Sequence, residues 1–130
     1  IYACVLFQGY TYDSKKIKKG ANEGNERCIL AVQLFARRIA DYIGQYYVRL
    51  GGCDLIVFSA GIGENSANVR EGVCEGLGYF GVEIDKEQNK KRGLAVNDIT
   101  GPNSKVKVLV VATNEELMIA RDTMNVVNAK

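Results

Sequence analysis

A glycine-rich segment stands where a strand is expected to end and a helix to begin. Gly61-Ile62-Gly63-Glu64-Asn65-Ser66 follows an apolar run at residues 54–59 and precedes a helical pattern. Glycines at the carboxyl end of a strand let a ligand approach the backbone, and the next helix offers unpaired N–H donors. Residues 60–66 are therefore expected to form a ligand-binding loop, with Asn65 or Ser66 capping the helix. A tight turn that binds nothing is the simpler interpretation.

The same segment is a near match to a dinucleotide-binding fingerprint. Gly61 and Gly63 occupy the first two glycine positions of the GxGxxG pattern, and Ser66 occupies the third. Asp85 lies where that pattern expects an acid that binds ribose. A dinucleotide-binding module that uses Gly61, Gly63 and Asp85 is therefore one alternative.

A second candidate site follows the apolar run at residues 106–111. Thr113-Asn114-Glu115-Glu116 has the spacing of a capping box, with Thr113 as the N-cap and Glu116 three residues on. Glu115 then projects about 100° away from Glu116 and is free to face a cleft beyond the strand. One such carboxylate can recruit Mg²⁺, which favours one or two carboxylates beside substrate phosphates.

The overall composition excludes several classes of function. The 130 residues carry 17 basic and 15 acidic side chains, a net charge of +2 that does not indicate nucleic acid or an anionic membrane as partner. Histidine is absent, which excludes His-based triads, His general bases and His-ligated metals. No run of 18 apolar residues exists to span a membrane, and the cysteines lack metal-site spacing, so reduced, mostly buried thiols are expected.

The elements around these sites predict an α/β fold with a mainly parallel sheet. Apolar residues with a helical period predict a long helix over residues 23–50, with the stripe Ile29, Val32, Ala36, Ile39, Ile43, Tyr46 and Leu50 in the core. Residues 54–59 and 106–111 predict two buried strands, and a helix carrying Val69, Val73, Leu77 and Phe80 follows residue 66. Weaker patterns predict a strand at residues 1–7, another at 82–85, a polar turn or a single helical turn at 86–93 and a loop at 100–104. The lysine-rich residues 15–19 are either a solvated face or a phosphate-binding cluster.

Several stretches of residues 22–123 together resemble one known family. They are Asn22-Glu23-Gly24-Asn25-Glu26-Arg27, the run from Asp54 to Ser66, Val69-Arg70, Asn89-Lys90, Arg92-Gly93, the run from Ser104 to Val110, and the run from Thr113 to Thr123. These stretches resemble the C-terminal part of the acetate kinase family. The GIGEN letters at 61–65 and the TNEE letters at 113–116 are specific in their combination and spacing.

The resemblance implies a ribonuclease-H-like, actin-type ATPase fold and a reversible transfer of the ATP γ-phosphoryl to acetate, which gives acetyl phosphate and ADP. It places Gly61, Ile62, Gly63, Glu64 and Asn65 against adenosine, and it makes Glu115 the residue associated with Mg²⁺. Asp13 and Lys15 align with a further nucleotide-binding segment, where the family has Arg in place of Lys15. Residues 1–21 otherwise match the family poorly.

The family's catalytic Arg and His residues and its phosphate-binding segments have no counterparts in this sequence. Residues 1–130 are therefore expected to be a single partial domain with no catalytic residue of its own, inactive alone. The resemblance further implies a cytoplasmic homodimer associated through this C-terminal domain, with no nucleic acid or membrane partner. A kinase for another short-chain fatty acid and a structural fragment without a ligand are the remaining alternatives.

Overall fold

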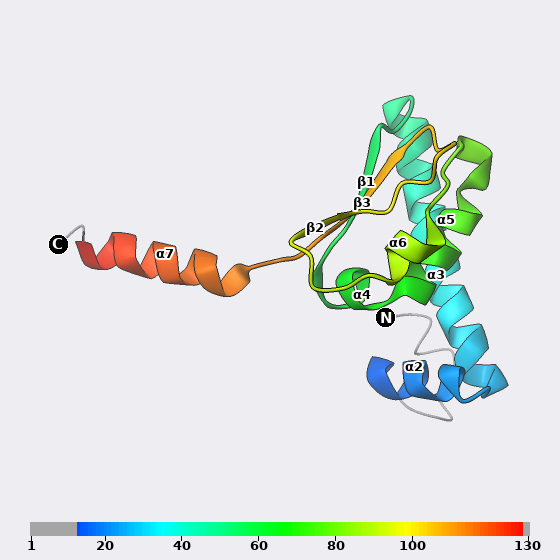
Figure 1. Ribbon diagram of the computed structural model, residues 1–130, viewed down its shortest axis with the longest axis horizontal. Coiled ribbons are helices and arrows are strands. Elements are labelled where there is room, and N and C mark those ends of the chain that lie inside the picture. The colour runs from blue at the N-terminus through cyan, green and yellow to red at the C-terminus, as the bar shows by residue number, and fades with distance from the viewer. Residues whose placement is uncertain (1–12, 129–130) are drawn as a thin grey trace.

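The computed structural model describes residues 13–128, apart from the side chains of Ser14 and Glu115, so the expected strand at 1–7 lies outside the described residues. The elements are α2 (Ser14–Asn22), α3 (Glu26–Leu50), β1 (Leu55–Phe58), α4 (Ala60–Asn65), α5 (Ala67–Gly76), the 3-10 helix η1 (Gly78–Phe80), α6 (Lys86–Lys90), β2 (Val96–Asp98), β3 (Lys107–Val111) and α7 (Glu115–Asn128) (Figure 1). Among the described helices, none is long and apolar enough to cross a membrane.

The sheet has three strands in the order β1-β3-β2. β1 and β3 are parallel, with Leu55 opposite Lys107 and Phe58 opposite Val110, whereas β2 pairs with β3 in the antiparallel direction. The α/β class with a mixed sheet and flanking helices is thus confirmed. Because β1 and β3 are parallel, the segments that follow them start at the same edge of the sheet.

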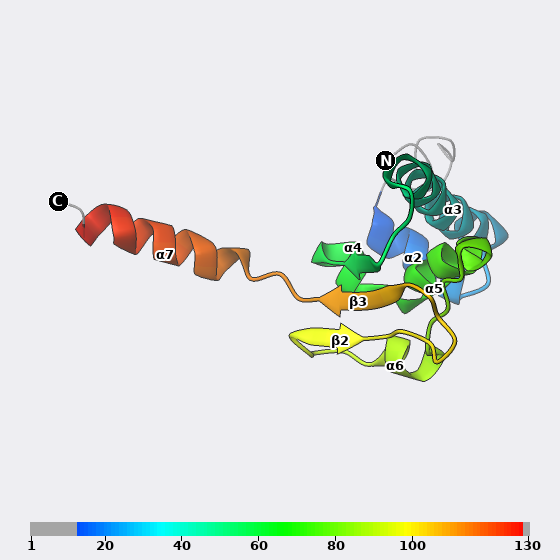
Figure 2. The same ribbon diagram turned by 90° about the horizontal axis from the view of Figure 1, so that it is seen from above.

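The core fills the space between one face of the sheet and the helices α3 and α5 (Figure 2). The strand side chains that point into it are Ile56, Phe58, Val108 and Val110. On α3 the expected stripe is only partly correct. Of its members, Ala36 is buried, and Val32, Ile39 and Ile43 are partly buried against the core. Tyr46 and Leu50 are 63% and 76% exposed at the far end of the helix.

Small residues let α3 and α5 approach closely. A Cβ atom added at Gly72 would lie 3.1 Å from Ala36 Cβ, and one added at Gly76 would lie 3.0 Å from Ala40 Cβ. Both pairs are spaced four residues apart on their helices, so they form one contact line. The contact fixes the position of α5 and of the segment that precedes it.

Two helices occupy the region in which one was expected. Asp13 accepts a hydrogen bond from the Lys15 N–H at the start of α2, and Gly24, at φ +85°, ends the turn between the helices. Asn25 then accepts a hydrogen bond from the Cys28 N–H, so α3 begins at Glu26 and not at residue 23. Gly51 ends α3 in the left-handed conformation, as a C-cap glycine does.

Other expectations at the local level were wrong. Residues 60–65 form the short helix α4 and not a loop, and Ser66 begins α5 without a side-chain cap. Residues 82–85 contribute one isolated bridge, from Ile84 to Thr100, in place of a strand. β2 was missed because it has three residues and includes Asn97 and Asp98, types that are depleted in strands. α6 falls within residues 86–93, where a polar turn or a single helical turn was expected.

The start of α7 corrects the expected capping box. Asn114, and not Thr113, caps the helix, because its Oδ1 accepts a hydrogen bond from the Leu117 N–H at 3.1 Å. Glu116 is therefore not at the third helical position. α7 projects away from the sheet and the other helices (Figures 1 and 2), and its described side chains are all exposed.

The described cysteines fit the expectation of reduced thiols. Cys28 and Cys74 are buried, Cys53 is partly buried, and all three are free of disulfides. Burial raises the pKa of the Cys74 thiol to about 12, so this side chain stays protonated and acts as a small apolar group in the core.

The glycine contact between α3 and α5 generates a stability prediction. Gly76→Val should destabilise the fold by about 1–3 kcal/mol, because the added atoms push against Ala40. The matched control is Glu75→Val, which places the same side chain at the preceding, exposed position of α5. Thermal unfolding should show a lower midpoint for Gly76→Val than for Glu75→Val, and equal midpoints would contradict the close packing.

Candidate functional site

A cavity of about 400 Å³ lies between α2, α3, α4 and α5. Its lining consists of Lys15, Ile17, Lys18, Ala21, Asn22, Ala31, Val32, Phe35, Gly61, Ile62, Asn65, Ser66, Asn68 and Val69. The volume is in the range of ordinary small-ligand pockets, roughly 300–1,000 Å³. Four of the residues expected from the sequence, Lys15, Gly61, Ile62 and Asn65, therefore meet in one place.

α4 forms one wall of this cavity because the chain turns sharply after β1. Ala60 has a φ of +58°, in the left-handed region that residues other than glycine rarely adopt. A Cβ atom added at Gly63 would lie 3.3 Å from the carbonyl carbon of Phe58, so this glycine lets α4 pack against the strand end. Gly63 thus serves the packing of α4, while Gly61 and Ile62 face the cavity.

α2 forms the opposite wall and contributes two cations. Asp13 caps the helix through the Lys15 N–H at 2.8 Å, and Lys15 itself lines the cavity. The Lys18 Nζ donates a hydrogen bond to the Asn65 carbonyl oxygen at 2.6 Å, which ties α2 to the end of α4. Burial, together with the neighbouring Arg92 and Arg70, lowers the pKa of Lys18.

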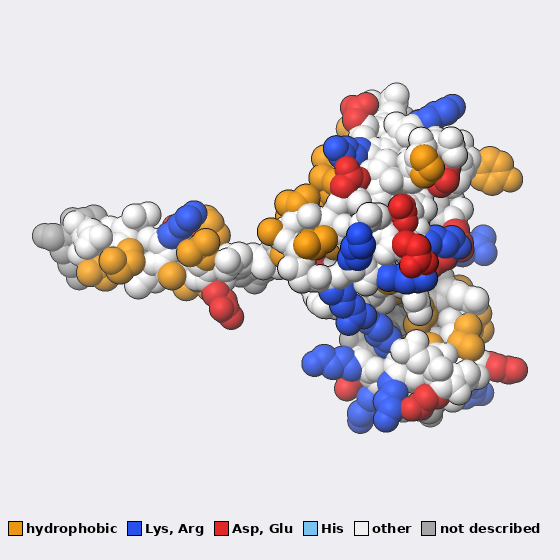
Figure 3. Space-filling view, in the orientation of Figure 1, with side chains coloured by type: hydrophobic (Ala, Val, Ile, Leu, Met, Phe, Trp, Pro, Cys, Tyr) orange, Lys and Arg blue, Asp and Glu red, His pale blue; other side chains and the backbone are white. Residues whose placement is uncertain are grey.

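The polar side chains that line the cavity are positively charged or neutral. Lys15 and Lys18 are cations, Asn22, Asn65 and Asn68 are amides, and the lining includes neither Asp nor Glu. Lys and Arg side chains gather over α2 and beside the gap above it (Figure 3). A ligand with an apolar body and either negative charge or hydrogen-bond acceptors suits such a lining.

Glu64 joins the two segments that follow the parallel strands. Its Oε1 accepts hydrogen bonds from the backbone N–H and the hydroxyl of Thr113, both at 2.9 Å. The backbone hydrogen bond, followed by the hydroxyl, holds the pKa of Glu64 below its usual value. The end of α4 and the residues before α7 are therefore connected directly.

The geometry disfavours the dinucleotide alternative. Asp85 accepts hydrogen bonds from the backbone N–H groups of Glu87 and Gln88, at 2.8 and 2.9 Å, and so caps α6. Its carboxylate is thereby engaged in holding the helix start and does not line the cavity beside Gly61.

Family models, protein sequences and solved structures were each compared with this chain, and all three comparisons match one family. The model of the acetokinase family matches residues 5–121. The acetate kinase of Treponema denticola is 51% identical over 119 residues, which cover 92% of this chain and 30% of that protein. The crystal structure of Porphyromonas gingivalis acetate kinase has a TM-score of 0.80 and 39% identity, with 95% of this chain and 31% of that chain covered.

The chain belongs to the acetokinase family. A crystal structure of a propionate kinase from Francisella tularensis also matches, with a TM-score of 0.72 and 35% identity over 83% of this chain and 27% of that chain. The chain spans about 30% of the length of the curated relatives that it matches.

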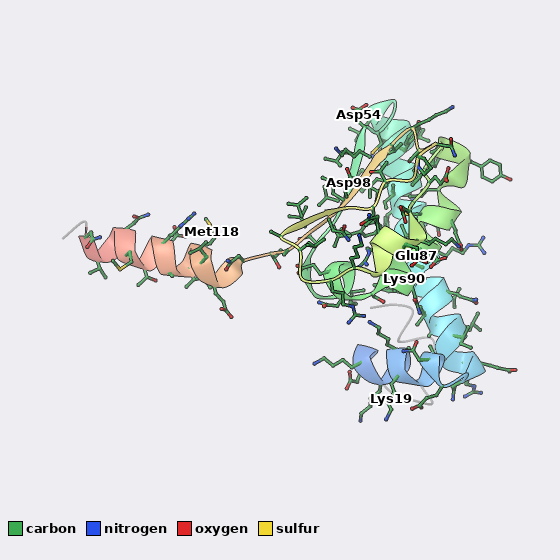
Figure 4. All side chains as sticks on the ribbon, viewed as in Figure 1. Lys19, Asp54, Glu87, Lys90, Asp98 and Met118 are labelled. Carbon is green, nitrogen blue, oxygen red and sulfur yellow. The ribbon has the colours of Figure 1, made fainter. Side chains whose placement is uncertain are left out.

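The residues that the acetokinase resemblance singled out take different positions. Gly61, Ile62, Asn65 and Lys15 line the cavity, whereas Glu64 binds Thr113 and Asp13 caps α2. Sequence reasoning did not single out Lys18, although it belongs to the lysine-rich residues 15–19, of which Lys19 instead pairs with Glu23 on the exposed side of α2 (Figure 4). At about 100° per residue, Lys18 and Lys19 point to different sides of α2, so a cluster of lysines in the sequence does not by itself tell which of them faces the cavity.

Glu115 is the first residue of α7 and lies four positions after Val111, the last residue of β3. Within residues 13–128, and the side chains that the structure describes there, no group of three or more Asp, Glu or Cys side chains could hold a metal ion. A single carboxylate such as that of Glu115 fits a Mg²⁺ ion whose other ligands are water and nucleotide phosphates. It does not fit a site built from protein ligands alone.

The contact of Glu64 with Thr113 generates a prediction about pH. The folded-state pKa of Glu64 lies below the ordinary 4.5, so the contact stabilises the fold above that pH and is lost as the pH falls through the lowered value. Thr113→Val keeps the backbone donor and removes the hydroxyl, so the pKa of Glu64 should rise toward 4.5.

Carbon-13 NMR titration of the Glu64 carboxyl measures this change. Thr123→Val is the matched control, because the Thr123 hydroxyl donates to the Ile119 carbonyl within α7. An unchanged Glu64 pKa in Thr113→Val, or an equal rise in the control, would contradict the direct hydrogen bond.

Proposed function

We propose that this chain carries the adenosine side of an ATP-dependent acetate kinase, which reversibly transfers the γ-phosphoryl of ATP to acetate. The observation that supports the proposal is the meeting of Lys15, Gly61, Ile62 and Asn65 around one cavity. These residues come from segments about fifty positions apart in the chain, and the family resemblance assigns all four to the nucleotide.

The cavity suits the base and ribose better than the phosphates. Ile17, Val32, Phe35 and Ile62 give it an apolar lining on which a purine ring can pack. The amide of Asn65 donates to the Gly61 carbonyl at 2.9 Å, which holds the end of α4 in a fixed shape beside the ligand. Lys15 lacks the planar group of the arginine that the family has at this position, so it contributes charge and an aliphatic stem in place of a stacking surface.

Glu115 is the proposed Mg²⁺-associated residue. It lies one residue after the cap of α7 and two after Thr113, which contacts α4. Bound Mg²⁺ supplies neutralisation of phosphate charge during the transfer. The chain's own contribution is one carboxylate at the start of the helix that follows β3.

The remainder of the chemistry requires residues outside this chain. Phosphoryl transfer depends on cations positioned around the transferring group, and the cavity offers only Lys15 and Lys18. We therefore propose that the isolated chain binds nucleotide without turnover. Acetate is the proposed acyl substrate, and a propionate kinase among the structural neighbours keeps another short-chain acid as the second candidate.

The proposed assembly is a cytoplasmic homodimer. The support within this chain is the exposed end of α3, where Tyr42, Tyr46, Val48 and Leu50 are all more than half exposed. Exposed apolar side chains that gather in this way are typical of contact surfaces between proteins.

Binding of ADP to the chain tests the proposal. The wild-type chain should bind ADP more tightly than NAD in isothermal titration calorimetry. Ile62→Ala should weaken ADP binding about ten-fold, because it removes roughly 1–2 kcal/mol of apolar contact with the base.

The matched control is Ile29→Ala, which removes the same atoms from α3 at a site outside the cavity lining. It should leave the affinity for ADP unchanged. Tighter binding of NAD, or equal losses in the two variants, would overturn the assignment of this cavity to adenosine.

The role of Glu115 is tested in a full-length acetokinase that includes the sequence of this chain. Glu115→Ala should raise the Mg²⁺ concentration needed for half-maximal activity, because one carboxylate ligand is lost. Glu116→Ala is the adjacent control and should change this requirement little, since the family resemblance assigns Mg²⁺ to Glu115 and not to Glu116. A larger effect at Glu116 would show that the metal-associated carboxylate is the other one.

A further inference from the structure

We infer that Arg70 is the positioning residue of the nucleotide site, acting through the backbone of α4. The inference deepens the proposed function and rests on it for the identity of the ligand. The contacts of Arg70 with α4 stand independently of that identity.

Arg70 lies on α5 and is one of the largest fully buried side chains, with an exposed fraction of 2%. Its guanidinium donates hydrogen bonds to two different elements. On α4, one terminal nitrogen reaches the carbonyl oxygens of Gly63 at 2.7 Å and Glu64 at 2.9 Å. On α6, the Nε reaches Asn89 Oδ1 at 2.7 Å, and the other terminal nitrogen reaches the Asn89 carbonyl at 2.6 Å.

The carbonyls of Gly63 and Glu64 belong to the last turn of α4. Carbonyls at a helix C-terminus lack partners within the helix and carry partial negative charge. Lys18 binds the next carbonyl, that of Asn65, at 2.6 Å. Two cations from different helices thus hold three successive carbonyls of α4, and Asn65 among them lines the cavity.

α4 needs such external support because it has only six residues. A helix this short is unstable by itself, since nucleation costs more than its few internal hydrogen bonds return. Its first residue, Ala60, is also held at a positive φ. The guanidinium therefore decides whether residues 61–65 keep the helical shape that presents Gly61, Ile62 and Asn65 to the ligand.

The charge of Arg70 has no acidic counterpart in the described part of the chain, where no ion pair involves this residue. A buried cation costs free energy unless it is hydrogen-bonded, and here backbone and amide oxygens fill that role. An apolar side chain at this position would leave the carbonyls of Gly63, Glu64 and Asn89 without this donor. The four bonds come from all three guanidinium nitrogens, a fork of donors that a lysine ammonium does not reproduce.

Asn89 extends the arrangement to α6 and α5. Its Nδ2 donates to the Ala67 carbonyl at 3.0 Å, at the start of α5, while its other groups accept from Arg70. Asn89 is itself buried, at 1% exposure. Asn89 thus fixes the orientation of the guanidinium, and the guanidinium in turn holds the carbonyls at the end of α4.

The experiment combines amide hydrogen exchange with ADP titration on the chain and its variants. Arg70→Lys keeps the positive charge and loses the fork. Arg92→Lys is the matched control, because Arg92 is an exposed neighbour whose charge influences Arg70 and which makes no described hydrogen bond to α4. Thermal unfolding measures global stability in parallel, and Arg70→Met shows the loss of the charge as well.

In Arg70→Lys, exchange of the α4 amides should become about ten-fold faster relative to those of β3, and ADP affinity should fall about ten-fold. Arg92→Lys should change neither. A uniform acceleration across α4 and β3 that follows the unfolding midpoint would overturn the inference in favour of a general structural role, as would unchanged α4 exchange.

The two proposals fail in different ways. If the wild-type chain binds no ADP, the proposed function fails, and the exchange ratio between α4 and β3 still decides the role of Arg70 on α4. If wild type binds ADP and Arg70→Lys binds it equally well, the positioning role is overturned while the proposed function stands. If Arg70→Met does not fold, the comparison of the two lysine variants carries the test.

Discussion

The parallel pairing of β1 with β3 is the constraint on which the rest of this structure depends. It brings the ends of two strands about fifty residues apart in sequence to one edge of the sheet, with Phe58 opposite Val110. α4 then follows the first strand and the start of α7 follows the second. The two bonds from Thr113 to Glu64 are possible only because of this register. The nucleotide side and the proposed Mg²⁺ side of the site are therefore neighbours by topology before any side chain contributes.

The shape of the cavity depends in turn on the contacts that fix α4 in place after the end of β1. Gly63 packs beneath it against Phe58, Arg70 and Lys18 bind the carbonyls at its end, and α3 forms the floor with Val32 and Phe35. The close approach of α5 to α3 at Gly72 and Gly76 keeps Arg70 within reach. These contacts give the cavity a defined shape. Its lining supplies two cations, Lys15 and Lys18, which are fewer than phosphoryl transfer requires.

The strong periodic patterns predicted the elements that position the site. The continuous apolar runs predicted the strands β1 and β3, and the alternation of helices with strands predicted the α/β class correctly. The expectation that the first of these strands is fully buried was wrong, because β1 lies at the edge of the sheet and Leu55 and Val57 on its outer face are exposed. Gly61, Ile62 and Asn65, from the segment expected to bind a ligand, line a cavity, but the helical form of this segment was not foreseen. That form depends on Arg70, whose partners lie on α4 and α6, and a contact of this kind has no local sequence signal. The cap of α7 was misassigned for a related reason, because Thr113 binds Glu64, 49 residues away, and leaves Asn114 to cap the helix.

The central claim is that the cavity between α2 and α4 takes the adenosine part of a nucleotide. Nitrogen-15 NMR spectra of the labelled chain, recorded during titration with ADP, test it most directly. The account predicts that the largest shifts fall on the amides of Lys15, Lys18, Gly61, Ile62 and Asn65, the residues that line the cavity. Shifts that centre on the groove between α3 and α5, beside Gly44 and Phe80, or the absence of saturable shifts, would contradict it.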